Sequence, residues 1–119
     1  RGVDVCFDPV GGELGETSLR CLSWGGRYLV IGFAAGQLPT IKANRLLVKN
    51  IAAVGFYWGG YRRHDPGRLK AGLATLLDWY EEGRLQPHVS RRFPLAETRA
   101  ALAELEQRRS TGKVVLEVG

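Results

Sequence analysis

Short apolar runs that stop at glycine-containing turns recur three times in the first half of the chain. The runs are Val3–Asp8, Arg27–Ile31 and Ile51–Val54. The first is followed by Pro9-Val10-Gly11-Gly12, and its composition predicts a strand that is buried on both faces. Helical apolar spacing separates the runs, in Glu13–Ser23 and Thr40–Lys49. This alternation predicts an α/β fold with a parallel sheet.

Glycine and proline mark where the predicted elements begin and end. The pair Gly25-Gly26 is expected to stop the first helix before the second strand begins. The stretch Tyr57–Tyr61 contains two glycines among aromatic residues and predicts a loop. Asp65-Pro66 is a favourable helix start, with the aspartate as N-cap and the proline in the first turn.

The helix that starts at Pro66 is expected to run to about Glu82 and to stop at Gly83. Its apolar residues have the spacing of one helix face, which we expect to pack against the sheet. These residues are Leu69, Leu73, Leu76, Leu77 and Tyr80. The chain then continues as an extended piece over His88–Phe93, a helix over Leu95–Arg108 and a strand over Val114–Val118.

The number of strands is small for a sheet of this kind. A doubly wound sheet has about six strands and binds its ligand at their carboxyl ends, whereas the pattern here supplies three before it changes. The chain contains no methionine and begins within a strand. We therefore expect an incomplete doubly wound sheet with flanking helices and a C-terminal helix and strand, forming the C-terminal portion of a longer protein.

Composition narrows the classes of function. The formal net charge is +5, but arginines are scattered among acids and form no basic stripe, so we expect no nucleic-acid partner. No apolar run is long enough for a bilayer, and the first residues lack a secretory signal, so we expect no membrane partner and a cytoplasmic location. Cys6 and Cys21 lack ligand or CxxC spacing and are expected to be buried, reduced thiols. No metal site is expected in this chain.

Five segments in register carry a family resemblance. They are Phe7–Gly12, Gly25–Ala34, Leu47–Asn50, Phe93–Leu95 and Thr111–Val115. Their order and spacing resemble the C-terminal half of the zinc-independent quinone oxidoreductases of the medium-chain dehydrogenase/reductase superfamily. The resemblance implies that residues 1–83 are the C-terminal half of a Rossmann-like dinucleotide-binding domain. It implies that residues 84–119 return to a GroES-like substrate domain.

The same resemblance implies a cofactor, a reaction and the residues of a binding site. The cofactor would be NADPH, which passes a hydride to a quinone or another conjugated carbonyl. The implied cofactor-binding residues are Val10, Gly11, Ile31, Gly32, Phe33, Phe56, Tyr57, Trp58 and Lys113. Glycine allows the backbone to approach a ligand closely, so backbone groups can orient the nicotinamide carboxamide. The resemblance assigns no catalytic residue.

Each of these residues also has a purely structural explanation. Turn geometry alone also explains Gly32 and Gly55, and a core or a dimer interface also explains the aromatic residues after the third strand. Lys113 is also explained as a surface lysine. Asp8 is interpreted as a turn-former that accepts backbone N–H groups rather than as a general base. His64 and His88 are expected to be exposed.

The missing first half of the nucleotide domain limits the expected activity. The glycine-rich phosphate turn and the residues that distinguish NADPH from NADH are absent, so the isolated chain is expected neither to bind the dinucleotide tightly nor to turn over a quinone. The strands Val3–Asp8 and Ile51–Gly55 are expected to be sheet edges that favour a homodimer or higher self-association. Reduction of enals, enones or enoyl thioesters and a non-catalytic interaction module remain alternatives.

Overall fold

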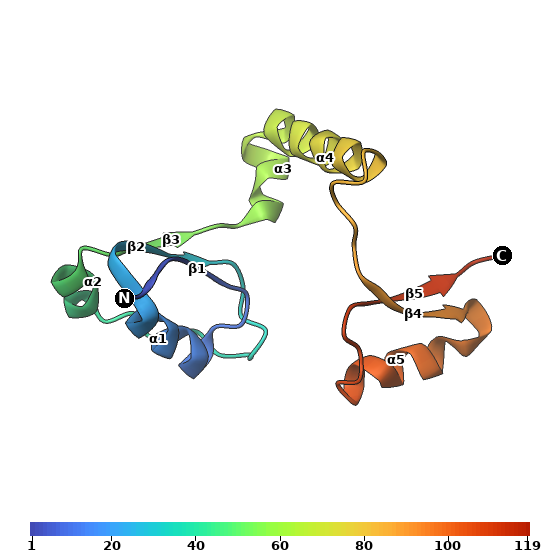
Figure 1. Ribbon diagram of the computed structural model, residues 1–119, viewed down its shortest axis with the longest axis horizontal. Helices are drawn as coiled ribbons and strands as arrows, with labels where there is room; N and C mark the ends of the chain where they lie inside the picture. The colour runs from blue at the N-terminus through green and yellow to red at the C-terminus, as the bar shows by residue number, and fades with distance from the viewer. The chain divides into compact units, whose positions relative to one another are not determined.

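The computed structural model describes residues 1–119 as two compact units, Arg1–Pro66 and Gly67–Gly119 (Figure 1). The first unit contains β1 (Val3–Asp8), α1 (Gly12–Cys21), β2 (Leu22–Val30), α2 (Ala43–Lys49), β3 (Ala52–Gly55) and α3 (Tyr61–His64). The second contains α4 (Pro66–Glu81), which begins at the boundary, and then β4 (Val89–Pro94), α5 (Thr98–Glu106) and β5 (Lys113–Glu117). Short 3₁₀ turns precede α3, at Trp58–Gly60, and α5, at Leu95–Glu97. No helix is long and apolar enough to cross a membrane.

The sheet of the first unit has the order β1-β2-β3, and all its strands are parallel. The predicted α/β class with three parallel strands and flanking helices is therefore confirmed. β1 and β3 are the two edges of this sheet, as the sequence predicted. Because successive parallel strands require a crossover, α1 and α2 connect them.

The core of the first unit lies on one face of the sheet. It is formed by Leu19, Leu22, Tyr28 and Ile51, with Leu46 of α2 packed against it. The side chain of Lys49 donates to the carbonyl oxygens of Arg20 and Leu22, each at 2.8 Å, and so satisfies acceptors at the end of α1. Asn50 adopts a left-handed conformation that ends α2.

The other face of this sheet is uncovered, which corrects the prediction that β1 is buried on both faces. Within β1 only Asp8 is buried, and Val3, Val5 and Phe7 alternate on an exposed face. The register places Phe7 beside Leu29 of β2, and Leu29 beside Val54 of β3, which is also exposed. The core, which includes Leu19 of α1 and has Leu46 of α2 packed against it, lies on the opposite face, so these apolar side chains have no cover within their unit.

The boundary between α1 and β2 also differs from the prediction. α1 ends at Cys21, and Gly25-Gly26 lies inside β2 rather than at the end of the helix. Val3 pairs with Leu22 but Val5 pairs with Arg27, so the segment between Leu22 and Arg27 bulges out of the ladder. Gly25 has φ +75, a conformation that glycine adopts without strain.

The cysteines are less buried than predicted. Cys6 is half-buried, on β1 against the core, and Cys21 is exposed at the last position of α1. The burial of Leu19 and Leu22 orients the end of the helix so that the two residues between them, Arg20 and Cys21, face solvent. The exposure of His64 and His88 is confirmed.

The second unit contains a parallel pair of strands, β4 and β5, connected by α5. Glu104 and Ala101 of α5 are its buried residues. The helix α4 ends where the sequence predicted: Gly83 has φ +72, and its N–H donates to the carbonyl of Tyr80 at 3.0 Å.

Within the second unit the apolar stripe of α4 is uncovered, and its packing against the sheet, which lies in the first unit, stays a prediction. Leu73, Leu76, Leu77 and Tyr80 are all exposed. The second unit builds its small core from α5 on the β4–β5 pair, so it supplies no apolar surface that covers this stripe.

Candidate nicotinamide-binding site

Asp8 organises the turn that follows β1. Its Oδ1 accepts hydrogen bonds from the backbone N–H groups of Val10 at 2.8 Å and Gly11 at 2.9 Å. Gly11 has φ +72, and a Cβ there would lie 3.0 Å from the ring of Phe33, so a larger residue would be strained and would displace that ring. The interpretation of Asp8 as a turn-former is confirmed.

The other carboxylate oxygen of Asp8 accepts the hydroxyl hydrogen of Tyr28 in the core. Burial acts to raise the pKa of Asp8, but the hydrogen bonds from Tyr28, Gly11 and Val10 stabilise its charged form, and the pKa lies below its usual value. Burial, and then the bond to Asp8, raise the pKa of Tyr28 well above its usual value. Asp8 is therefore a buried, ionised structural group.

The turn after β2 is hydrogen-bonded along the turn after β1. Ile31 and Gly32 both donate their N–H groups to the carbonyl of Asp8, at 2.9 and 3.3 Å. Ala34 donates to Pro9 at 3.1 Å, and Ala35 donates to Val10 at 2.9 Å. A Cβ at position 32 would lie 3.2 Å from the carbonyl oxygen of Pro9, so glycine permits this close approach. The two turns therefore form one layer at the carboxyl ends of the strands.

A hollow of about 500 Å³ lies at the carboxyl ends of β2 and β3. Its lining residues are Val30, Ile31, Phe33, Gly55, Phe56 and Tyr57. The N–H of Phe56 donates to the carbonyl of Val30 at 3.0 Å, which holds the start of the loop after β3 beside β2. Gly55 has no atom within 4 Å of the place where a Cβ would be, so its missing side chain leaves open space.

Four of the nine predicted site residues line this hollow: Ile31, Phe33, Phe56 and Tyr57. Gly11 lies next to it through the ring of Phe33, and Val10 and Gly32 belong to the same hydrogen-bonded layer. Trp58 begins the 3₁₀ turn and is not among the lining residues. Lys113 is the first residue of β5, in the second unit, so its role stays a prediction.

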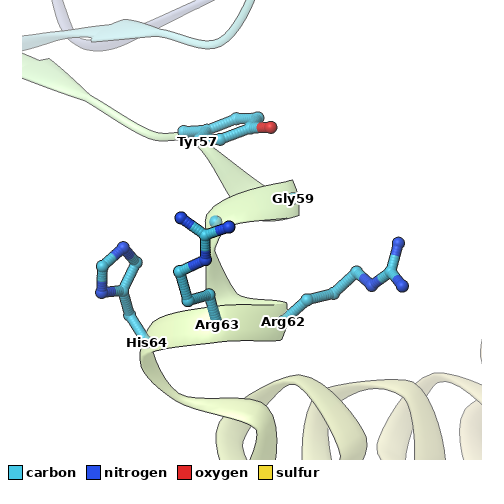
Figure 2. Close-up of a pocket in the computed structure, with 6 residues that line it drawn as sticks. Tyr57, Gly59, Arg62, Arg63 and His64 are labelled. Carbon is cyan, nitrogen blue, oxygen red and sulfur yellow. The ribbon is translucent and has the colours of Figure 1, made fainter.

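A second hollow, of about 460 Å³, lies next to the first, shares Tyr57 with it and was not predicted from the sequence (Figure 2). It is lined by Tyr57, Gly59, Gly60, Arg62, Arg63 and His64. The segment predicted as a loop here forms the 3₁₀ turn Trp58–Gly60 and the start of α3. The only signal in the sequence was the basic pair Arg62-Arg63 after a segment of aromatic residues and glycines.

The structure contains no group of three or more His, Cys, Asp or Glu side chains that is arranged to hold a metal ion. The donor set that zinc requires in proteins is thus not assembled from the residues of this chain.

A parallel sheet with glycine turns and an apolar hollow at its carboxyl edge defines an α/β protein of the Rossmann-like, ligand-binding class. A family model described as a zinc-binding dehydrogenase matches residues 1–116, and the chain belongs to that family.

The relatives that the chain matches agree with this assignment. It is 44% identical to quinone oxidoreductase-like protein 2 of Bos taurus over 97% of this chain and 33% of the relative. It is 41% identical to the homologue from Nematostella vectensis over 98% of this chain and 32% of the relative. The chain thus spans about a third of the length of these relatives. The resemblance to quinone oxidoreductases is confirmed.

A solved structure shows the same fold. The quinone oxidoreductase of Thermus thermophilus, solved alone and in complex with NADPH, matches with a TM-score of 0.77 and 35% identity. The match covers 98% of this chain and 37% of that chain. The predicted Rossmann-like class is therefore confirmed.

Proposed function

We propose that the protein containing this chain transfers hydride from NADPH to a quinone or another conjugated carbonyl compound. The observation that carries the proposal is the apolar hollow at the carboxyl ends of β2 and β3, next to two glycine turns. Membership of the dehydrogenase family and similarity to a quinone oxidoreductase solved with NADPH support it. This edge of a parallel sheet is where dinucleotides bind in related folds.

The residues of the hollow suit a nicotinamide ring. Phe33, Phe56 and Tyr57 provide flat apolar surface, and the open space at Gly55 lets a planar ring approach the backbone. NADPH would supply the hydride. In this proposal Ile31, Gly32 and Phe33 orient the ring, Val10 and Gly11 support them from the neighbouring turn, and the aromatic side chains exclude water from the reacting carbons.

The remaining assignments belong to the same proposal. Residues 1–83 are the C-terminal half of the dinucleotide-binding domain, and residues 84–119 return to the substrate domain. Trp58 and Lys113 complete the cofactor-binding set, and the protein acts in the cytoplasm. The exposed apolar face that contains Val5 and Phe7 supports self-association or contact with further parts of the protein.

The chain alone is proposed to be inactive. It spans about a third of its relatives and contains no glycine-rich phosphate turn of the GxGxxG type. A ring site without a pyrophosphate site gives little affinity for the dinucleotide.

Oxidation of NADPH at 340 nm tests the proposal, with 1,4-naphthoquinone as acceptor. The complete protein and the 119-residue chain are compared, with an enone as a second acceptor. Turnover of the quinone by the complete protein, and not by the 119-residue chain, supports the proposal. No turnover of either acceptor by the complete protein would refute it, and turnover by the isolated chain would refute its inactivity.

A further inference from the structure

We propose that the hollow after β3, lined by Arg62, Arg63 and His64, binds the oxyanion of a small ligand. The flat apolar part of this ligand occupies the Tyr57 end of the neighbouring hollow at the carboxyl ends of β2 and β3, beside the nicotinamide ring that the proposed function places there. If the proposed function is correct, the natural acceptor therefore carries a phosphate or carboxylate group. The statement about the acceptor rests on the proposed function, whereas the statement about oxyanion binding does not.

Tyr57 joins the two hollows. It lines both the apolar hollow with Phe33 and the polar hollow with Arg63. A Cβ at Gly59 would lie 3.1 Å from the nearest atom of the Tyr57 side chain, and a Cβ at Gly60 would lie 3.0 Å from it, so the ring lies directly on the glycine backbone. A side chain at either glycine would displace the ring, and the shared wall between the hollows depends on both residues.

Three cationic or potentially cationic side chains project from α3 around this wall. In Figure 2, Arg63 points its guanidinium group toward Tyr57, and Arg62 and His64 extend to either side. None of the three forms an ion pair in the structure. The guanidinium groups are thus free to bind an anion, and their planar donors suit the oxygens of phosphate and carboxylate.

The position of α3 is fixed by an aromatic contact. The rings of Phe56 and Tyr61 have centroids 5.9 Å apart at an interplanar angle of 43°. Phe56 lines the apolar hollow, and Tyr61 is the first residue of α3. The contact holds the basic helical turn next to the apolar hollow, so one small molecule can reach both.

The ligand class follows from the two linings. One part must be flat and apolar to contact Phe33, Phe56 and the ring of Tyr57, and the other must be anionic to pair with Arg63 and Arg62. A neutral quinone satisfies only the first requirement and free phosphate only the second. A ring that carries an oxyanion satisfies both requirements. Its affinity is higher than that of either part, because once one part is bound the other is already held close to its own hollow.

The test is calorimetric titration of the complete protein, without NADPH, with 1-naphthyl phosphate, 1-naphthol and inorganic phosphate at constant ionic strength. We expect 1-naphthyl phosphate to bind at least about tenfold more tightly than either other probe, the size of one charge-assisted contact. Arg63→Gln should remove most of this advantage, and Arg62→Gln part of it. Arg99→Gln removes an exposed arginine of α5 and should change nothing.

Equal affinities for 1-naphthyl phosphate and 1-naphthol would overturn the inference, as would equal effects of Arg63→Gln and Arg99→Gln. Circular dichroism checks that the variants are folded. Oxidation of NADPH by the neutral 1,4-naphthoquinone is measured separately. If the protein binds 1-naphthyl phosphate but does not oxidise NADPH with the quinone, only the proposed function is refuted. If it oxidises NADPH with the quinone but does not prefer 1-naphthyl phosphate, only the oxyanion site is refuted.

Discussion

Tyr28 donates its phenolic hydroxyl to the Oδ2 atom of Asp8 in the core of the first unit, while the Oδ1 atom of the same carboxylate accepts two backbone N–H groups of the following turn. Asp8, a buried residue of β1, thus connects the core to the hydrogen-bonded turns after β1 and β2. Tyr28 is completely buried, and Asp8 is 5% exposed. Any change to this pair is therefore expected to alter stability and the shape of the turn together.

Replacement of the tyrosine tests the pair directly. Tyr28→Phe removes the hydroxyl and leaves one carboxylate oxygen of Asp8 buried without its donor. We expect the free energy of unfolding, measured by urea denaturation, to fall by about 1–3 kcal/mol. Tyr80→Phe changes an exposed tyrosine in α4 and should have almost no effect. Equal changes in the two variants would contradict a stabilising role for the bond.

The pH dependence of stability follows from the two pKa shifts. The pKa of Asp8 is lowered in the folded state from 3.8, so its contribution is present above about pH 4 and is lost as pH falls through the folded pKa. The pKa of Tyr28 is raised from 10.0, so its contribution is present below pH 10 and is lost as pH rises through the folded pKa. Urea denaturation between pH 2 and 11 should show the acid loss and the beginning of the alkaline loss. Asp8→Asn should flatten the acid loss, and an unchanged acid limb in that variant would assign the loss to other groups.

Gly15 of α1 lies against this pair. A Cβ at position 15 would meet the hydroxyl of Tyr28 and would lie 2.6 Å from Oδ2 of Asp8. We expect Gly15→Ala to lower the free energy of unfolding by about 1–3 kcal/mol through overpacking. Gly72→Ala, in the helix α4 with open space around it, should instead raise it by about 0.5–1 kcal/mol. Stabilisation by both substitutions would show that α1 shifts without cost.

The second unit has its own buried carboxylate, Glu104. Its Oε1 accepts from Arg109 at 2.6 and 3.0 Å, and its Oε2 lies 3.3 Å from Nε of Arg91. The hydrogen bond from Arg109 lowers the pKa of Glu104, and the positive charges of Arg109 and Arg91 lower it further. Burial acts in the opposite direction, but the pKa stays below its usual value. Glu104→Gln should therefore lower the melting temperature of this unit more than Glu117→Gln, which breaks an ion pair exposed on both sides. A larger effect of the second variant would contradict the structural role.

The open space at Gly55 offers a test of the hollow. Gly55→Val places a side chain at the edge of the proposed ring site without clashing with the protein. In the complete protein we expect kcat/KM for NADPH to fall by about tenfold or more, because the cofactor ring loses its place. Ala52→Val, at the other end of β3 and outside the hollow, is the matched control. Unchanged kinetics in both variants would place the nicotinamide elsewhere.

The hydrophobic pattern predicted most elements because it reports local preferences. The three strands of the first unit, α4 with its stop at Gly83, and the turn-forming role of Asp8 are all present. The pattern failed at Gly25-Gly26, because a glycine pair ends a helix and forms a strand bulge equally well. Only the pairing of Val3 with Leu22 decided between them.

The site was predicted in part. The strand-end residues Ile31, Phe33, Phe56 and Tyr57 line one hollow because parallel strands bring their carboxyl ends to the same edge. The hollow beside Arg63 was not predicted, because it depends on the conformation of Tyr57 over two glycines.

The sequence by itself determined the α/β alternation, the glycine turns and the family resemblance, since these depend on residue type and spacing along the chain. Tertiary structure alone decided the parallel pairing of β4 with β5, and also the exposure of Phe7 and Leu77. An apolar periodicity fixes which side chains share a face. Burial of that face depends on whether another surface covers it, which no spacing along the chain records.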